Sequence, residues 1–265
     1  MRFDHNGRGA TRAGKNCFLL RVACILAGTC SLWCGIWGTV VHAQEAISAA
    51  PKLDSQNPGD NSRDANCGII YLGIVGALET SGYKGSGVVQ IRDILRGPAY
   101  PDVCAKTFSP YVWTAGLHWL LKHFEADPKR QTDVERKRAP KVILVGHSTG
   151  GWAVLGVARK LRRKNIPVEL IVLVDSVGIT DHTVPRNVKV AAIFHARDIL
   201  ILLTTKSLRL EDPSRTKIIA NVLVRGAGHE SVTRAPRIRE LVMSTVESLR
   251  AAPESPPGRD ARWQP

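Results

Sequence analysis

A short apolar run leads directly into a glycine-flanked serine and then into an amphipathic helix, and this order constrains the fold most strongly. The run is Val142–Val145, the turn is G-H-S-T-G at residues 146–150, and the helical pattern covers Trp152–Lys164. An unbroken apolar run that is rich in β-branched residues predicts a buried strand, and the 3.6-residue period after it predicts a helix packed on that strand. The turn between them must be tight. Glycines flank it because a side chain at either position would strike the strand or the helix. The sequence therefore predicts a strand–turn–helix unit with Ser148 at the bend.

The same alternation of apolar runs and helical patterns continues on both sides of this unit. Further strands are expected at Gly68–Ile74, Val103–Phe108, Leu170–Val174, Val188–Phe194 and Ile218–Val224. Further helices are expected at Val88–Leu95, Thr114–Phe124 and Ile238–Leu249. Apolar runs that lie between helices and do not alternate with polar residues are typical of parallel strands buried on both faces. The expected fold class is α/β, a mostly parallel sheet with helices on both faces.

The two ends of the chain differ from this central region. Residues 1–43 begin with a basic stretch, continue through the uncharged residues 22–41 and end in Val41-His42-Ala43. This pattern predicts a signal peptide with cleavage after Ala43, or a membrane anchor, because about 20 apolar residues suffice to span a bilayer. Residues 44–66 are expected to be a flexible linker, residues 67–251 the folded domain, and residues 252–265 a disordered tail. The domain would be periplasmic or extracellular, or held at the membrane by residues 22–41.

The net charge and the positions of the cysteines indicate which partners and which cellular compartment to expect. The formal net charge is +14, but no basic patch interleaved with aromatic residues occurs, so no nucleic-acid partner is expected. Four of the six cysteines lie in residues 1–43, which leaves Cys67 and Cys104 in the domain. An oxidising compartment would permit a disulfide between them, and two buried free thiols are the alternative.

The G-x-S-x-G motif between a strand and a helix resembles the nucleophile elbow of the α/β-hydrolase superfamily, which includes lipases, esterases and thioesterases. The resemblance covers about residues 68–249. It implies a compact α/β-hydrolase fold with an eight-stranded or trimmed sheet and a triad in the chain order serine, acid, histidine. Ser148 is then the nucleophile. Only residues 175–187 occupy the place where many relatives insert a lid domain, so an open site without a lid domain is expected.

The candidate base and acids follow from their positions after strands. His229 lies in the glycine-rich loop after the expected last strand, where the resemblance places the base. Asp198 follows the strand that ends at Phe194, which is the usual acid position of the superfamily. Asp175 directly follows the preceding strand, where pancreatic-type lipases carry their acid. Asp198 and Asp175 both remain candidates for the acid of the triad, with Asp181 as a third and weaker candidate.

The resemblance also implies an oxyanion hole made by two backbone N–H groups. One donor is expected at Thr149, and the other in the loop after the first strand, at Ile74 or Val75. No His-x-x-x-His, Cys-x-x-Cys, dinucleotide fingerprint or phosphate loop occurs, so neither a metal nor a cofactor is expected.

These features favour a serine hydrolase (carboxylesterase- or lipase-like) that cleaves a small-molecule or lipid ester through an acyl-serine intermediate. The sequence leaves two alternatives open. One is a thioesterase or acyltransferase that uses the same triad. The other is a non-catalytic binding protein with a hydrolase fold.

Overall fold

The computed structural model describes residues 67–124, 139–178, 182–197 and 205–252. All of them belong to one compact unit, Gly59–Pro265. The expected leader, the linker and most of the expected tail lie outside the described residues, so the predictions made for them stay predictions. Within the described part of the chain, every helix is too short or too polar to cross a bilayer.

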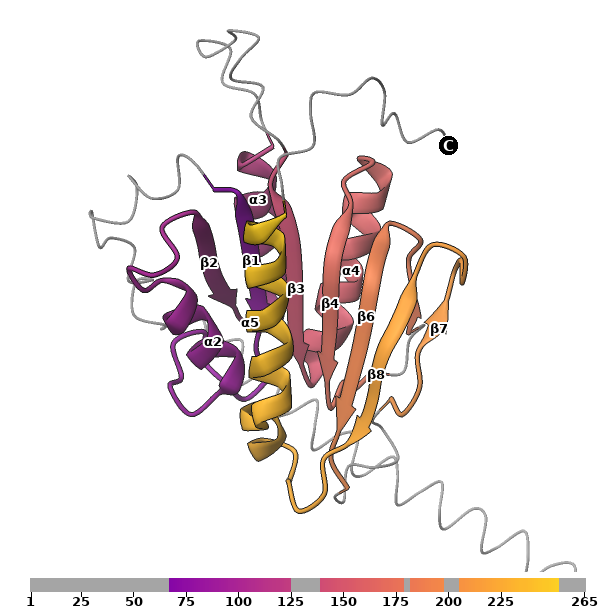
Figure 1. Ribbon diagram of the computed structural model, residues 1–265. Helices are drawn as coiled ribbons and strands as arrows, with labels where there is room; N and C mark the ends of the chain where they lie inside the picture. Colours follow the sequence, from indigo (N-terminus) through magenta and orange to yellow (C-terminus); the bar gives the residue numbers. More distant parts are fainter. Residues whose placement is uncertain (1–66, 125–138, 179–181, 198–204, 253–265) are drawn as a thin grey trace, which may run out of the picture. The chain divides into compact units, whose positions relative to one another are not determined.

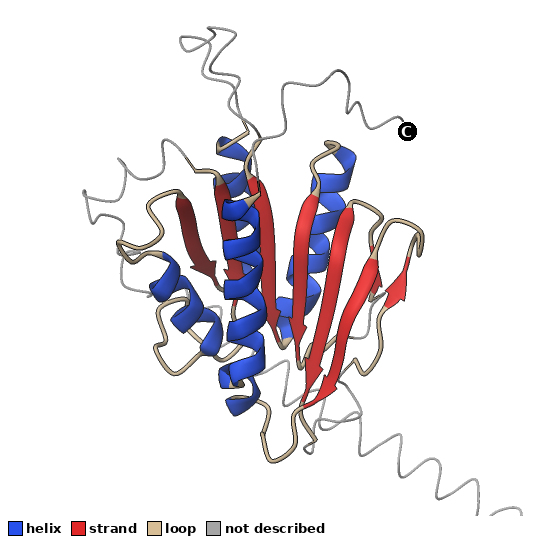
Figure 2. Cartoon of the chain, viewed as in Figure 1, coloured by secondary structure: helices blue, strands red, loops and turns tan. Residues whose placement is uncertain are grey.

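A six-stranded parallel sheet forms the centre of the described unit (Figure 1; Figure 2). Its order is β2-β1-β3-β4-β6-β8. The strands are β1 (Ile69–Ile74), β2 (Val103–Phe108), β3 (Lys141–His147), β4 (Val168–Val174), β6 (Val188–His195) and β8 (Lys217–Leu223). Because all neighbours pair in parallel, the carboxyl ends of the strands lie at one edge of the sheet. The expected fold class is confirmed, and the six strands of the described residues correspond to the trimmed form of the sheet.

Helices cover both faces of this sheet (Figure 1). Helices α2 (Gly87–Leu95) and α5 (Pro236–Ala251) pack on one face, and α3 (Trp113–Lys122) and α4 (Thr149–Arg163) pack on the other. Successive residues of the central strands pack into the two cores on opposite faces: Tyr71 packs toward α2 and α5, while Ile70 and Leu72 pack toward α3 and α4. Burial on both faces explains why the central strands are unbroken apolar runs.

Two short strands lie outside the main sheet. Strand β5 (Thr183–Val184) pairs in parallel with β7 (Arg209–Leu210). Two 3-10 helices, η3 (Pro110–Val112) and η5 (Ser231–Arg234), complete the described elements. None of these four was predicted, because segments of two to four residues are too short to show a periodicity.

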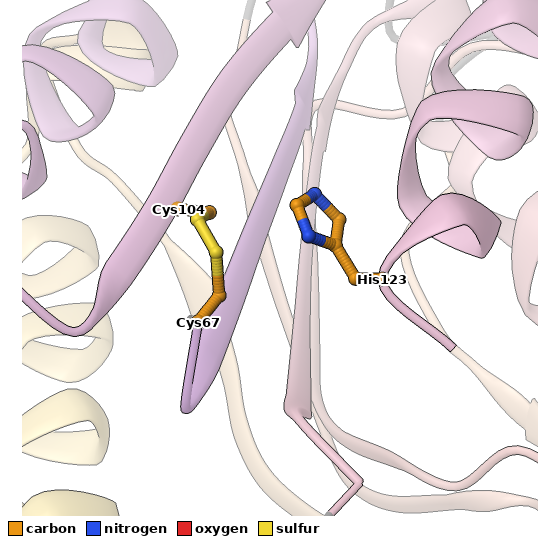
Figure 3. Close-up of side chains that lie close together, drawn as sticks. All are labelled: Cys67, Cys104 and His123. Atoms are coloured by element: carbon orange, nitrogen blue, oxygen red, sulfur yellow. A yellow bond between two sulfur atoms is a disulfide. The ribbon is translucent and has the colours of Figure 1, made fainter. Parts of the chain in front are cut away.

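A disulfide joins the beginnings of the first two strands (Figure 3). Cys67 lies just before β1 and Cys104 near the start of β2, with their Cα atoms 5.6 Å apart. This separation is within the range that a disulfide requires. Of the two alternatives left open by the sequence, the structure contains the disulfide.

Candidate active site

Ser148 occupies a strained bend between β3 and α4. Its φ is 55° and its ψ is −126°, a region that residues with a side chain rarely adopt. Three hydrogen bonds hold the bend: Ser148 N–H donates to Val174 O at 2.9 Å, and Ser148 O accepts from Gly151 N at 3.0 Å and Val177 N at 3.1 Å. Neighbouring structure therefore fixes a conformation that the residue itself disfavours, which is typical of functional positions.

The glycines of the motif are required by close backbone approach. A Cβ atom at Gly146 would overlap the carbonyl oxygen of Gly150. A Cβ atom at Gly150 would overlap the carbonyl oxygen of Ile74 in the neighbouring strand β1. Side chains at these two positions would thus clash, as expected from the sequence. The glycines avoid the clash, so α4 begins directly at the sheet edge with its amino end beside Ser148.

A chain of hydrogen bonds links Ser148, His229 and Asp175. His229 Nε2 lies 2.9 Å from Ser148 Oγ, and His229 Nδ1 lies 2.6 Å from Asp175 Oδ2. Asp175 is fully buried, and its other oxygen, Oδ1, accepts from Ala196 N at 3.0 Å. The His229 side chain remains 18% exposed, so a reactant can reach the junction between serine and imidazole. This is the geometry that a serine nucleophile, a general base and an orienting carboxylate require.

The two acid candidates of the sequence have different outcomes. Asp175 lies at the carboxyl end of β4 and occupies the Nδ1 side of His229. Asp198 and Asp181 lie outside the described residues. The structure therefore brings Ser148, His229 and Asp175 together and leaves the other two aspartates without a described position.

The expected oxyanion donors are only partly retained. Thr149 is the first residue of α4 and directly follows Ser148, as the expectation requires. Val75 N–H donates to Phe108 O at 3.1 Å, so it belongs to the sheet and is not retained as a donor. Ile74 is fully buried inside the ladder between β2 and β3, and it is not retained either. The physical reason is that β1 ends at Ile74 as expected, but the hydrogen bond of Val75 continues the pairing with β2 for one more residue.

Two site residues were missed by the sequence analysis. His147, the residue before the nucleophile, is buried, with Nδ1 3.2 Å from Glu79 Oε2 and Nε2 2.8 Å from His229 O. The rings of His147 and His229 are 4.8 Å apart between centroids. His147 occupies an unspecified position of the motif, and Glu79 lies in a polar loop, so no sequence signal joined them.

Glu79 is stabilised as a carboxylate by several donors. Its Oε2 accepts from Gly76 N at 3.0 Å and from Ser86 Oγ at 3.2 Å, besides its contact with His147. Burial raises the pKa of the Glu79 carboxyl, but the hydrogen bond and charge of His147 and the bonds from Gly76 and Ser86 outweigh it. The net pKa lies below the ordinary value of 4.5.

One group of three potential metal ligands occurs in the described part of the chain. It consists of Cys67, Cys104 and His123, whose ligand atoms lie within 4.8 Å of one another (Figure 3). Both sulfurs are joined in the disulfide and offer no thiolate, which is the form of cysteine that binds metals. In its disulfide form this group is not a metal centre. It also lies at the amino-terminal edge of the sheet, opposite the edge that carries Ser148.

Comparison with known proteins gives structural similarity only. No protein-family model matches the sequence, and no curated protein matches it. The structure is similar to RedJ at 13% identity and a TM-score of 0.41, covering 69% of this chain and 91% of that one. The NocB thioesterase domain of the nocardicin cluster has 12% identity, a TM-score of 0.40, and coverage of 70% and 96%. Esterase PE8 has 13% identity, a TM-score of 0.40, and coverage of 69% and 94%. Similarities with these TM-scores do not indicate a reaction. The arrangement of the site residues does.

Proposed function

We propose that the protein is a serine hydrolase that cleaves carboxylic esters through an acyl-serine intermediate. The hydrogen-bonded chain from Ser148 through His229 to the buried Asp175 carries this proposal. A bystander serine would not need a strained bend held by three backbone hydrogen bonds, and a bystander histidine would not need a buried carboxylate partner.

The reaction follows from the positions of these three groups. Ser148 Oγ attacks the ester carbonyl carbon while its proton passes to His229 Nε2. The C–O bond to the alcohol then breaks, and the leaving oxygen takes the proton from His229. His229 next removes a proton from water, the hydroxide attacks the acyl-serine, and the acid leaves as Ser148 recovers its proton. Throughout, Asp175 holds the tautomer of His229 and stabilises its charged form. Thr149 N–H supplies one donor to the oxyanion.

The surface beside the nucleophile favours an apolar acyl group. Trp152 lies in the first turn of α4, four residues after Ser148, and is 38% exposed. Its ring meets the edge of Trp113 at a centroid distance of 6.4 Å. Aromatic side chains at this position offer apolar contact area to an acyl chain, so we infer a small-molecule or lipid ester as the substrate.

Two features support export of the enzyme. Residues 1–43 have the composition of a signal peptide or membrane anchor, and the domain contains a disulfide. Disulfides persist mainly in oxidising compartments. We therefore propose that the enzyme acts in the periplasm, outside the cell, or at the membrane surface through residues 22–41.

Labelling with a fluorophosphonate tests the proposal directly. The Ser148 oxygen should displace fluoride and form a stable phosphonyl-serine in the wild-type protein, with no labelling of Ser148→Ala and little of His229→Ala. A panel of oxygen esters and thioesters of graded chain length would then separate esterase from thioesterase activity. Absence of labelling in folded wild type, beside a control esterase that labels, would favour a non-catalytic protein.

A further inference from the structure

We propose that Glu79 and the charged form of His147 make a buried ion pair that positions the catalytic base. The pair ties the loop of His229 to the bend of Ser148 and to the loop after β1. The proposal rests on the proposed hydrolase function for its catalytic consequence. Its structural part, the charge state of His147, stands independently.

The hydrogen bonds determine the protons on His147. Its Nε2 lies 2.8 Å from the carbonyl oxygen of His229, and a carbonyl oxygen can only accept, so Nε2 carries a proton. Its Nδ1 lies 3.2 Å from Glu79 Oε2, which already accepts from Gly76 N and Ser86 Oγ. Because Oε2 accepts from two other donors, it carries no proton of its own, so the proton between Oε2 and Nδ1 belongs to Nδ1. With both nitrogens protonated, His147 is an imidazolium.

The surroundings of His147 explain why this charge is retained. The ring is buried, and two ionisable residues among those described contact it, Glu79 through Nδ1 and His229 through its ring. The Glu79 side chain is also buried, at 7% exposure. A buried charge without its partner is strongly unfavourable, so the pair forms and breaks as a unit.

The pair links three segments that are far apart in sequence. His147 lies within β3, Glu79 lies in the loop between β1 and α2, and the carbonyl of His229 belongs to the loop between β8 and α5. A bond to the backbone of His229 fixes the residue whose ring must meet both Ser148 and Asp175. Displacement of a catalytic group by about 1 Å lowers the rate by about 100-fold. Loss of the pair should therefore lower kcat more than it changes KM.

Kinetics of two variants test the positioning role. Glu79→Gln and His147→Asn should lower kcat, and the maximal rate of fluorophosphonate labelling, about 10- to 100-fold with little change in KM. Glu230→Gln is the matched control, since it removes an exposed carboxylate next to His229 that takes no part in the network. The proposal is overturned if folded Glu79→Gln keeps kcat within about twofold of this control.

Nuclear magnetic resonance of the full chain tests the charge state without any activity. With ¹⁵N-labelled histidine, both ring nitrogens of His147 should be protonated near neutral pH in wild type, and one of them should lose its proton in Glu79→Gln. A single protonated ring nitrogen in wild type overturns the proposal. This measurement needs only the wild-type protein, so it decides the question even if the variants fail to fold. If the imidazolium is present but Ser148 does not react with the fluorophosphonate, the proposed hydrolase function fails while the ion pair stands.

Discussion

At the scale of single residues, backbone strain coincides with the proposed chemistry. Three non-glycine residues among those described have a positive φ: Ser148 at 55°, Asp175 at 42° and Asn165 at 57°. Asn165 follows the end of α4, where asparagine commonly adopts this conformation. The other two are the proposed nucleophile and acid, each at the carboxyl end of a central strand. The sheet imposes both conformations and thereby aims two side chains at one imidazole.

The identity of the acid gives a prediction that separates the two candidates. Asp175→Asn should lower kcat by about 10⁴-fold, because an amide at Nδ1 can favour the wrong tautomer of His229 and cannot stabilise its charge. Asp198→Asn, measured with the same ester, should retain most of the rate. A larger loss in Asp198→Asn than in Asp175→Asn would show that the triad assigned from the described residues is wrong.

The carboxylate of Glu79 gives a prediction about stability and pH. Because the pKa of Glu79 is lowered in the folded protein, its ionised form stabilises the fold above the ordinary value of 4.5. That stability is lost as the pH falls through the lowered folded pKa. The free energy of unfolding of wild type should therefore exceed that of Glu79→Gln near pH 6, and the difference should shrink below about pH 4.5.

Urea unfolding at a series of pH values measures this difference. The same pair of proteins in a His147→Asn background provides the control, since His147 supplies the main contacts that lower the pKa of Glu79. There the difference should depend much less on pH. An equal pH dependence in both backgrounds would contradict the role assigned to His147.

At the scale of secondary structure elements, the sequence predicted the strands and helices but not the contacts that loops make. Every strand of the main sheet and all four described helices were expected near their observed positions, because burial on one face gives a helix its 3.6-residue period and burial on both faces gives a strand an unbroken apolar run. The sequence could not choose between Asp175 and Asp198, since both follow strands whose carboxyl ends share one edge. That choice, like the contact between Glu79 and His147, depends on loop conformation, which leaves no period in the sequence.

The contact between α2 and η5 gives a prediction at this scale. Gly87 begins α2, its N–H donates to Thr233 Oγ1 at 3.0 Å, and a Cβ atom there would overlap the Thr233 carbonyl. Gly87→Ala must push apart α2 and the segment that follows His229. We expect a loss of about 1–3 kcal/mol in the free energy of unfolding, together with a lower kcat.

Gly82→Ala is the matched control for this variant. A Cβ atom at Gly82 meets nothing within 4 Å, so the same chemical change should leave stability and activity close to wild type. Thermal unfolding and ester turnover of both variants check the prediction. Equal behaviour of Gly87→Ala and Gly82→Ala would mean that the contact with Thr233 is not needed to hold the His229 segment.

At the scale of the whole described unit, the two edges of the sheet have separate roles. The carboxyl edge holds Ser148, Asp175 and His229, all from loops that follow strands. The amino edge holds the disulfide, which joins the beginnings of β1 and β2. Because β2 is the last strand on its side of the sheet, it has one strand neighbour, and the disulfide adds a covalent link to that neighbour.

This separation predicts that the disulfide affects stability and not catalysis. The bridge closes a loop between residues 37 apart in sequence, for which chain-entropy arguments give about 4 kcal/mol of stabilisation. Replacing both Cys67 and Cys104 by serine should lower the free energy of unfolding by about 2–4 kcal/mol and leave kcat within about twofold of wild type.

Reductant should lower the free energy of unfolding of wild type by a similar amount. The double variant keeps the four cysteines of residues 1–43, so its own response to reductant, expected to be small, measures their contribution. A large loss of kcat in the folded double variant would show that the two edges are coupled.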